Sequence, residues 1–330
     1  MKPNEQTITV MQDTISKGSI LNQLKIKTQS NNITLPDYIE FMIVNSILYM
    51  EMIEAERENG KVLNSVCDDN MQADNATFEG WAICLKAWLP EMIEKVCLKW
   101  TPPVSDNSLH YNRFLYRVVR FSETYDWFTI ADSLQDIIGR FKNNLSSLTN
   151  NFGNKEPSEP NSRGEKYLEY MIVHKHEYAT EFKKKFGLEY FNHQLPVGVK
   201  RNGKSFFTGR ASAIDLWGRK GDTISIFELK YKNKMVGIIS ELFLYTCIIR
   251  DMIIGTITPP DSAKCKRKCE RELYAKISNI SEIKAYMLSE VYHPLVTQQA
   301  IDLMNTNNLL SCQPKIHYEA ATTPEGWLKF

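Results

Sequence analysis

The sequence predicts two parts of different fold class: an all-helical N-terminal domain over residues 1–150 and a mixed α/β domain over residues 160–330. Apolar residues recur at helical spacing in the first part, and short alternating segments separated by tight turns fill the second. The chain has 330 residues, of which 43% are hydrophobic and 24% are charged. This length and balance predict a globular protein that can bury a sizeable core.

Three helices are expected in the N-terminal domain. Asp37 can cap the first, whose apolar residues recur at helical spacing: Phe41, Ile43, Val44, Ile47 and Leu48. The second is expected from Thr77 to about Leu98 and the third over Tyr111 to Phe141. Residues 1–34 are polar and show no clear period. Such a helical unit would serve recognition, oligomerisation or partner binding.

Turn chemistry over residues 143–164, with two prolines and little to bury, predicts the domain boundary. The elements expected beyond it are a helix at 162–186, strands at 190–199, 206–217 and 223–231, a helix at 236–254, a basic helical stretch at 264–277, a strand at 283–288, a helix at 297–305 and a strand at 315–319. Asn202-Gly203 predicts a hairpin turn, because both residues tolerate positive φ. No internal repeat is evident.

Cysteine usage and hydropathy predict a cytoplasmic protein without a membrane partner. The seven cysteines are odd in number and scattered, which suits reduced thiols better than a disulfide framework. The longest apolar run, from Ile238 to Ile257, is interrupted by Glu241, Arg250 and Asp251 and is therefore not expected to span a membrane. The first residues lack the apolar stretch of a signal peptide.

Charge is balanced overall but concentrated locally. The formal net charge of +1 gives no evidence for a polyanionic partner. The segment from Lys183 to Lys234, however, contains twelve Lys and Arg residues but only four Asp and Glu residues. A basic surface of this kind suits a phosphate backbone, and its alternative interpretation is an ordinary solvated face. The candidate nucleic-acid contacts in this segment are Lys200, Arg201, Lys204 and Arg210.

Three ionisable residues stand in two apolar strands on either side of a tight turn. Asp215 lies within the first expected strand, and Glu228 and Lys230 lie at the end of the second. Residues i and i+2 of a strand share a face, so Glu228 and Lys230 project together. The short turn makes the strands antiparallel neighbours and brings Asp215 beside Glu228. Charges in such apolar strands are costly unless they pair or bind a metal.

These residue types fit a divalent cation and phosphoryl chemistry. Mg²⁺ prefers oxygen ligands and is typically bound by one or two carboxylates together with waters and phosphate oxygens. Such an ion lowers the pKa of bound water and neutralises charge that develops on a phosphoryl group. A neighbouring lysine can orient or activate the attacking water. The expected cofactor is therefore Mg²⁺ or Mn²⁺.

This order of residues resembles the signature of the PD-(D/E)XK nuclease superfamily, in which an aspartate is followed by an interval that contains a turn and then by Glu-x-Lys. Here it reads Ile214-Asp215 and Glu228-Leu229-Lys230, with Ile214 in place of the proline. The resemblance covers about residues 162–290 and implies a restriction-endonuclease-like mixed β-sheet flanked by helices. It further implies that Asp215, Glu228 and the backbone carbonyl of Leu229 hold the metal, while Lys230 serves the nucleophilic water.

Flanking residues extend this resemblance. A helix before the strands often carries a glutamate in the superfamily, and Glu165 is the first candidate, with Glu169 next. A helix after the motif often carries a polar residue and a tyrosine one turn apart, as in the RecB-like branch. Glu241 and Tyr245 stand at this i, i+4 spacing, with glutamate where glutamine is usual.

The expected function is that of a metal-dependent nuclease that hydrolyses phosphodiester bonds. DNA is expected as substrate rather than RNA, with restriction, phage defence or repair as roles by analogy. The N-terminal domain would then support a homo-oligomer or a protein partner. The alternative is a non-catalytic nucleic-acid-binding or assembly module that retains the nuclease fold.

Overall fold

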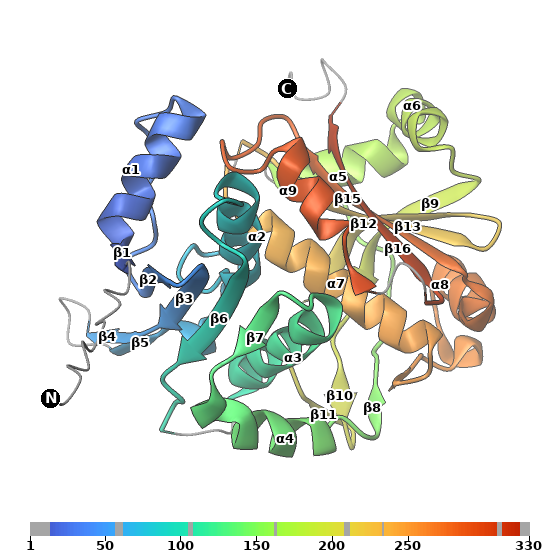
Figure 1. The fold of residues 1–330 in the computed structure, drawn as a ribbon. Helices are drawn as coiled ribbons and strands as arrows, with labels where there is room; N and C mark the ends of the chain where they lie inside the picture. Colours follow the sequence, from blue (N-terminus) through green and yellow to red (C-terminus); the bar gives the residue numbers. More distant parts are fainter. Residues whose placement is uncertain are drawn as a thin grey trace, which may run out of the picture.

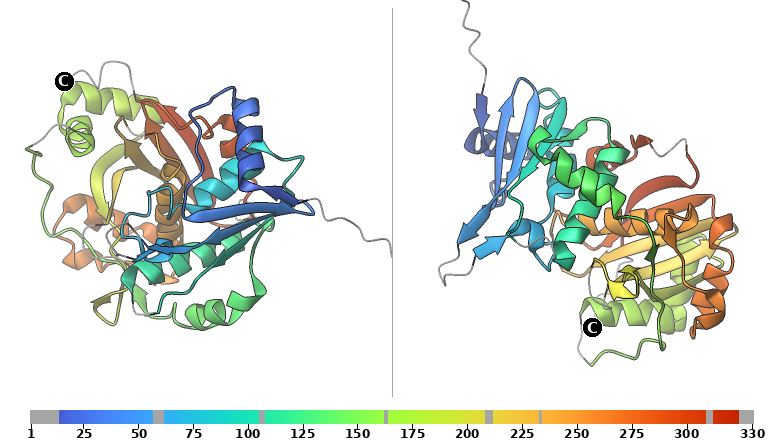
Figure 2. Two further views of the ribbon diagram at one scale, coloured as in Figure 1. Left: turned by 90° about the vertical axis from the view of Figure 1, so that its left-hand side faces the viewer. Right: turned by 90° about the horizontal axis from the view of Figure 1, so that it is seen from below.

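The computed structural model describes residues 14–56, 62–104, 108–161, 164–207, 212–232, 234–308 and 312–323. Two five-stranded sheets, one from each half of the chain, flank a pair of packed helices, α2 (Phe78–Trp88) and α7 (Ile238–Ile253) (Figures 1 and 2). Both halves are therefore mixed α/β. Within the described ranges, no helix is long and apolar enough to cross a membrane.

The N-terminal sheet has the strand order β1-β2-β3-β6-β7. Its strands are β1 (Thr14–Ser16), β2 (Ile39–Val44), β3 (Ile47–Met52), β6 (Lys95–Trp100) and β7 (Phe128–Ile130). Besides α2, the helices of this half are α1 (Lys17–Thr28), α3 (Leu109–Thr124) and α4 (Gln135–Asn143). A small ribbon pairs β4 (Glu54–Glu56) with β5 (Val62–Asn64).

The expectation of an all-helical N-terminal domain is wrong, because residues 39–52 form the antiparallel hairpin β2–β3. Alternate residues of β2 are buried, which is the period of a half-buried strand. The apolar residues of this segment fit both periods, so spacing alone did not decide between helix and strand. Asn45 and Ser46, with φ of 50° and 62°, form the two-residue turn between the strands.

Two further predicted helices are shorter than expected, because strands form in part of their predicted ranges. The helix expected to reach Leu98 ends at Trp88, just before Pro90, and β6 follows it. Proline lacks the backbone N–H that would continue the helix. Strand β7 likewise separates α3 from α4 within residues 111–141.

The C-terminal sheet has the order β16-β15-β13-β12-β9. Its strands are β9 (Tyr190–Pro196), β12 (Ala213–Lys220), β13 (Thr223–Lys230), β15 (Glu282–Ser289) and β16 (Lys315–Thr322). The helices of this half, besides α7, are α5 (Glu165–His174), α6 (His176–Phe186), α8 (Lys268–Tyr274) and α9 (Gln298–Met304). The expected order of helices and strands is confirmed in outline, with three differences: the helix over 162–186 is divided at Lys175, the strand expected at 206–217 begins at Ala213, and short strands not expected from the sequence occur at 200–201, 204–205 and 257–258.

A third sheet joins the turn-rich segment to the second half. Its order is β11-β10-β8-β14, formed by β8 (Leu148–Thr149), β10 (Lys200–Arg201), β11 (Lys204–Ser205) and β14 (Ile257–Thr258). The expected turn at Asn202-Gly203 is confirmed, with φ of 50° and 76°, but it joins the short strands β10 and β11. The strands expected on either side of it, at 190–199 and 206–217, instead pair directly as β9 and β12.

The two large sheets share one pattern of strand order and direction. In each, three antiparallel strands are followed by two parallel ones: β1-β2-β3 then β6 and β7, and β9-β12-β13 then β15 and β16. Helices α2 and α7 occupy the first parallel crossover of each sheet, and α3 and α9 the second. The architecture therefore repeats although the sequence shows no repeat.

The halves pack through a shared apolar core. One cluster of buried side chains draws residues from both large sheets and from α2, α3 and α7. A Cβ on Gly80 of α2 would lie 2.6 Å from Cγ1 of Val236, so α2 and the segment just before α7 approach closely only because this residue is glycine. Next to it, Ser240 donates a 2.8 Å hydrogen bond to the buried Glu79. A second cluster, on the other face of the C-terminal sheet, packs it against α5 and α6.

Candidate active site

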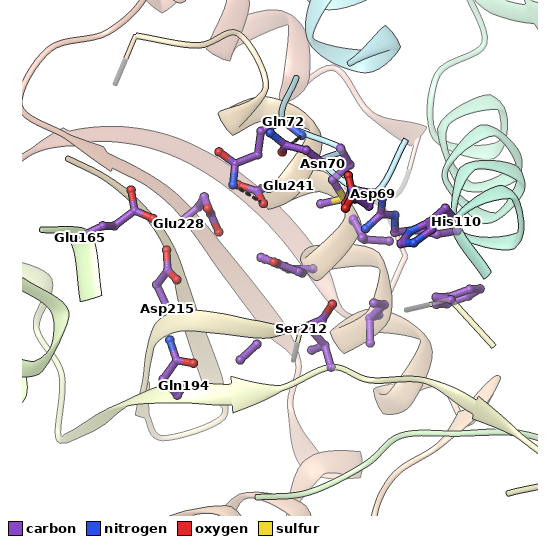
Figure 3. A pocket seen from close by; sticks show the side chains of 18 of the residues that line it. Asp69, Asn70, Gln72, His110, Glu165, Gln194, Ser212, Asp215, Glu228 and Glu241 are labelled. Atoms are coloured by element: carbon purple, nitrogen blue, oxygen red, sulfur yellow. Dashed lines mark hydrogen bonds between the residues drawn. The ribbon is translucent and has the colours of Figure 1, made fainter. Parts of the chain in front are cut away.

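Asp215, Glu228 and Lys230 lie together at one end of the β12–β13 pair. The strands are antiparallel neighbours across a two-residue turn. The backbone N–H of Leu229 donates a 2.9 Å hydrogen bond to Oδ2 of Asp215, which fixes this carboxyl group beside the end of β13. Figure 3 shows the Asp215 and Glu228 carboxyl groups facing the same part of a cavity. The orientation that the sequence motif requires is therefore present.

Lys230 is the centre of a buried cluster of carboxylates. Its Nζ lies 2.5 Å from Oε1 of Glu228, 2.9 Å from Oε2 of Glu241 and 3.8 Å from Oε1 of Glu165. Burial alone would lower the pKa of Lys230, but Glu228 and Glu241 outweigh burial and hold this pKa well above its ordinary value. The side chain therefore stays a cation.

Burial has the opposite effect on the two strand carboxyl groups. It raises the pKa of Asp215 and of Glu228 well above their ordinary values, and for Glu228 the nearby Asp215 and Glu241 add to the effect. Oε2 of Glu228 is buried and has no hydrogen-bond partner among the described residues. An unpaired buried carboxylate oxygen is costly. The Glu241 carboxyl group lies close enough to hydrogen-bond with Glu228 and raises its pKa, so the two carboxyl groups need a shared proton or a cation between them.

The helices before and after the strands bring the flanking residues to the same cavity. Glu165 lies in the first turn of α5, and its Oε2 accepts a 3.2 Å hydrogen bond from the backbone N–H of Tyr231. Glu241 lies in the first turn of α7, and Tyr245 follows one turn later. All three flanking residues line the cavity. The i, i+4 spacing of Glu241 and Tyr245, and the resemblance that pointed to Glu165, thus identified side chains that line one cavity.

The cavity has a volume of about 510 Å³ and is built by both halves of the chain. One wall carries the carboxylates of the second half. The other comes from the first half and was missed by the sequence reasoning: Asp69, Asn70, Met71, Gln72, His110 and Arg113 (Figure 3). No local pattern distinguishes these residues, because only the packing of the halves places them at the site.

Gln72 connects this second wall to the carboxylate cluster. Its Nε2 donates a 2.7 Å hydrogen bond to Oε1 of Glu241, whose other oxygen contacts Lys230. A Cβ on Gly237, at the start of α7, would lie 2.2 Å from the carbonyl oxygen of Gln72. The loop that carries Gln72 is therefore pressed against the N-terminus of α7, and the absence of a side chain at Gly237 permits this contact.

A buried polar group supports the cavity floor next to Asp215. Gln194 lines the cavity with φ of 52°, and its Nε2 donates to both carboxyl oxygens of Glu169 at 2.8 and 2.9 Å. His193 Nδ1 lies 3.1 Å from the same carboxyl group. Burial raises the pKa of Glu169 to about 8 and lowers that of His193 to about 4. Glu169, the second candidate for the flanking glutamate, thus contacts the cavity lining but not Lys230.

The basic residues expected to bind nucleic acid lie apart from this cavity. Lys200 and Arg201 belong to β10 and Lys204 to β11, and none of these three is part of the described cavity wall. Arg201 instead lies over the ring of Phe206, 5.8 Å from its centroid. Arg210 lies outside the described residues. Their contact with nucleic acid stays a prediction.

Among the residues that the structure describes, only two carboxylates, those of Asp215 and Glu228, are candidates to hold a metal ion here. Over the described parts of the chain, no group of three or more His, Cys, Asp or Glu side chains is arranged to hold a metal ion. Lys230 occupies the centre of the acidic cluster and pairs with one oxygen of Glu228. Asp215 and the unpartnered Oε2 of Glu228 are oxygen donors of the type that Mg²⁺ accepts in pairs.

Comparison of the chain with protein-family models, with curated proteins and with solved structures gave no match. The assignment of a function to this site therefore depends on its residues and their geometry.

Proposed function

We propose that this chain is a divalent-metal-dependent nuclease that hydrolyses phosphodiester bonds, with DNA as the preferred substrate. The observation that carries the proposal is that Asp215 and Glu228 line one cavity while the buried Lys230 pairs with Glu228 behind it, and Oε2 of Glu228 has no hydrogen-bond donor among the described residues. Charged groups are rarely placed so deeply without a functional or pairing reason, and perturbed pKa values in a cavity favour a functional one.

The order of elements supports a restriction-endonuclease-like fold for the second half. A helix, α5, precedes three antiparallel strands, and α7 follows the strand that ends in Glu228-Leu229-Lys230. This is the helix–strands–helix setting that the resemblance to PD-(D/E)XK nucleases implies. Fold alone does not imply activity; the side chains that the strands carry are what favours a nuclease.

Asp215 and Glu228 would hold Mg²⁺ or Mn²⁺, with the backbone carbonyl of Leu229 as a further donor. That carbonyl now accepts a 3.2 Å hydrogen bond from Lys230 Nζ, so it faces the cluster. When bound, the ion would neutralise negative charge on the phosphoryl group and make water more acidic. The carboxyl groups, whose raised pKa values reflect burial, favour a cation as partner.

Lys230 would act as a positive charge and hydrogen-bond donor, not as a proton acceptor. Three carboxylates surround it and raise its pKa, so it keeps its proton at neutral pH. Glu241 and Glu165, which line the cavity, hold its ammonium group beside the cavity wall, and Gln72 orients Glu241. A fixed donor at this place can orient a water molecule or stabilise an anionic oxygen.

The proposal is tested by cleavage of plasmid and of single-stranded DNA with Mg²⁺ or Mn²⁺. Wild type is compared with Glu228→Ala and Lys230→Ala. Two exposed residues of the N-terminal sheet, Glu51 and Lys99, supply matched controls as Glu51→Ala and Lys99→Ala. Cleavage that disappears only in the first pair supports the nuclease. Equal cleavage in all proteins removes it.

A non-catalytic nucleic-acid-binding module is the second candidate. It is favoured by the ion pair of Lys230 with Glu228, which already satisfies one carboxylate oxygen, and by the two-carboxylate donor set. Metal-independent DNA binding, with no cleavage under Mg²⁺, Mn²⁺ or other divalent ions, is its distinguishing result.

A further inference from the structure

The wall of the cavity that comes from α3 contains a buried cation without a carboxylate partner. Arg113 is 6% exposed and lines the cavity. Its Nη2 donates to the backbone carbonyls of Asp68 and Asp69 at 2.8 and 3.1 Å, while its buried Nε has no partner among the described residues. Within the same ranges it forms no ion pair with a carboxylate.

Arg117, one turn further along α3, is a buried arginine that does have a carboxylate partner and can be compared with Arg113. Its Nε donates at 2.7 Å to one oxygen of the buried Glu79, and its Nη2 contacts the other. Both arginines are almost fully buried, yet only Arg117 has a counter-ion. A guanidinium group left without an anion is costly, and burial, aided by the charge of Arg117, lowers the pKa of Arg113 to about 10. An anionic ligand in the cavity would relieve this cost.

The remaining groups on this wall suit a phosphate. His110 lies on the same helix, one turn before Arg113, and its buried Nδ1 also has no hydrogen-bond partner among the described residues. The amide side chain of Asn70 lines the same wall (Figure 3). Arginine presents fixed N–H groups that match phosphate oxygens. Asp69 also lines the wall, and the carboxylates of Asp68 and Glu241 lie near enough to offset part of the lowering of the Arg113 pKa, although neither forms an ion pair with it among the described residues.

The size of the cavity restricts what can reach both walls. At about 510 Å³ it has the volume of a pocket for one small ligand. A double helix would need a broad groove, whereas an unpaired strand can enter a pocket one nucleotide at a time.

We propose that Arg113 binds a phosphate group of a single-stranded nucleic acid, next to the phosphate that Asp215 and Glu228 act upon. This inference rests on the proposed nuclease function and names the form of its substrate. The first half of the chain thereby supplies a substrate-binding residue to a site whose reacting groups belong to the second half.

The test measures binding without cleavage. A fluorescent single-stranded oligonucleotide is titrated in EDTA over a series of salt concentrations, with wild type, Arg113→Gln, Arg113→Lys and the exposed control Arg140→Gln. Loss of one charged hydrogen-bond partner predicts about tenfold weaker binding for Arg113→Gln. The binding constant falls with salt, and the loss of one phosphate contact should make the slope of log K against log salt less steep by about 0.7 for a single strand. Arg113→Lys keeps the charge and the wild-type slope, and Arg140→Gln changes neither quantity.

The outcomes separate this inference from the nuclease proposal. An unchanged salt slope in Arg113→Gln overturns the phosphate contact, even where cleavage still requires Glu228. Binding that depends on Arg113, together with no cleavage under any divalent ion, supports the contact and removes the nuclease. A duplex of the same sequence that binds as tightly, with the same dependence on Arg113, overturns the single-strand form of the substrate. Where Arg113→Gln does not fold, Arg113→Lys is judged by its affinity: it retains the charge and a donor for the Asp68 and Asp69 carbonyls but loses the paired N–H groups that match phosphate oxygens, so binding should weaken at an unchanged salt slope, and wild-type affinity overturns the contact.

Discussion

The two large sheets have the same strand order and directions but opposite chemistry at equivalent positions. Counted from their two-residue turns, Asp215 and Glu228 are the sixth residues of β12 and β13. The sixth residues of β2 and β3, counted in the same way, are Ile39 and Met52. Both of these are fully buried apolar side chains. The sheet therefore does not require charge at these positions.

This difference shows that the carboxylates of the C-terminal sheet are not explained by folding. Apolar residues satisfy the same place in the N-terminal sheet at no desolvation cost. In the second sheet, by contrast, Asp215 and Glu228 are buried at a desolvation cost that raises their pKa values. Lys230 forms an ion pair with Glu228 there. We infer that stability is given up there for chemistry, while the N-terminal copy serves packing and supplies one wall of the cavity.

The largest expected effect comes from making the second sheet resemble the first. Asp215→Ile combined with Glu228→Met should reduce DNA cleavage by at least about a hundredfold, since electrostatic groups at the reacting centre are lost. Mg²⁺ should raise the melting temperature of wild type by binding the folded state, and this shift should vanish in the variant. Cleavage rates and thermal melts with and without Mg²⁺ measure both effects. A melt that responds equally to Mg²⁺ in both proteins contradicts the site.

The reverse exchange should damage the first sheet. Met52→Glu places a carboxylate in an apolar core with no lysine to receive it, so the free energy of unfolding should fall by about 3–5 kcal/mol. Urea denaturation measures this loss, with Glu51→Gln on the exposed side of the same strand as control. If Met52→Glu is as stable as wild type, the argument from equivalent positions fails.

A smaller effect is expected from Glu169, which lies behind the second sheet's site. Burial raises its pKa in the folded protein to about 8, whereas in the unfolded chain the carboxyl group ionises near 4.5. The folded state binds this proton more tightly, so its contribution to stability is lost as pH rises towards 8. His193, with its pKa lowered to about 4, acts in the opposite direction but only up to about pH 6.5.

The stabilities of wild type and Glu169→Gln are therefore compared between pH 6.5 and 8, where His193 no longer contributes. The urea midpoint of wild type should fall across this interval by more than that of Glu169→Gln, which cannot ionise. Parallel pH profiles for the two proteins would show that Glu169 is already ionised in the folded state.

The smallest expected effect concerns the hydrogen bond by which Gln72 of the first half positions Glu241 of the second half. Gln72→Ala removes the hydrogen bond to Glu241 and loosens the partner of Lys230. Loss of one such bond predicts a kcat about three- to tenfold lower. KM should change little, because Gln72 acts through Glu241 and not on the substrate. Gln298→Ala on α9 removes a comparable exposed hydrogen bond and is the control. An effect on KM alone would assign Gln72 to substrate binding.

Sequence reasoning worked best where patterns are local. The turn and the alternation over 223–231 predicted that Glu228 and Lys230 share a face, and the i, i+4 spacing predicted that Glu241 and Tyr245 do so as well. It failed over residues 39–52, where apolar residues satisfy a helical and a strand period at once. Pairing with β1 and β6 decides that choice, and those strands are distant in sequence.

The sequence alone determined which residues can carry chemistry: two carboxylates and a lysine on strands joined by a tight turn, because strand periodicity and hairpin geometry are local. Only the tertiary structure decided what they face. The loop that carries Gln72 and the helix that carries Arg113 reach the site through packing of α2 and α3 against the second half, which depends on contacts between residues more than a hundred positions apart. Such contacts leave no periodic signal in the chain.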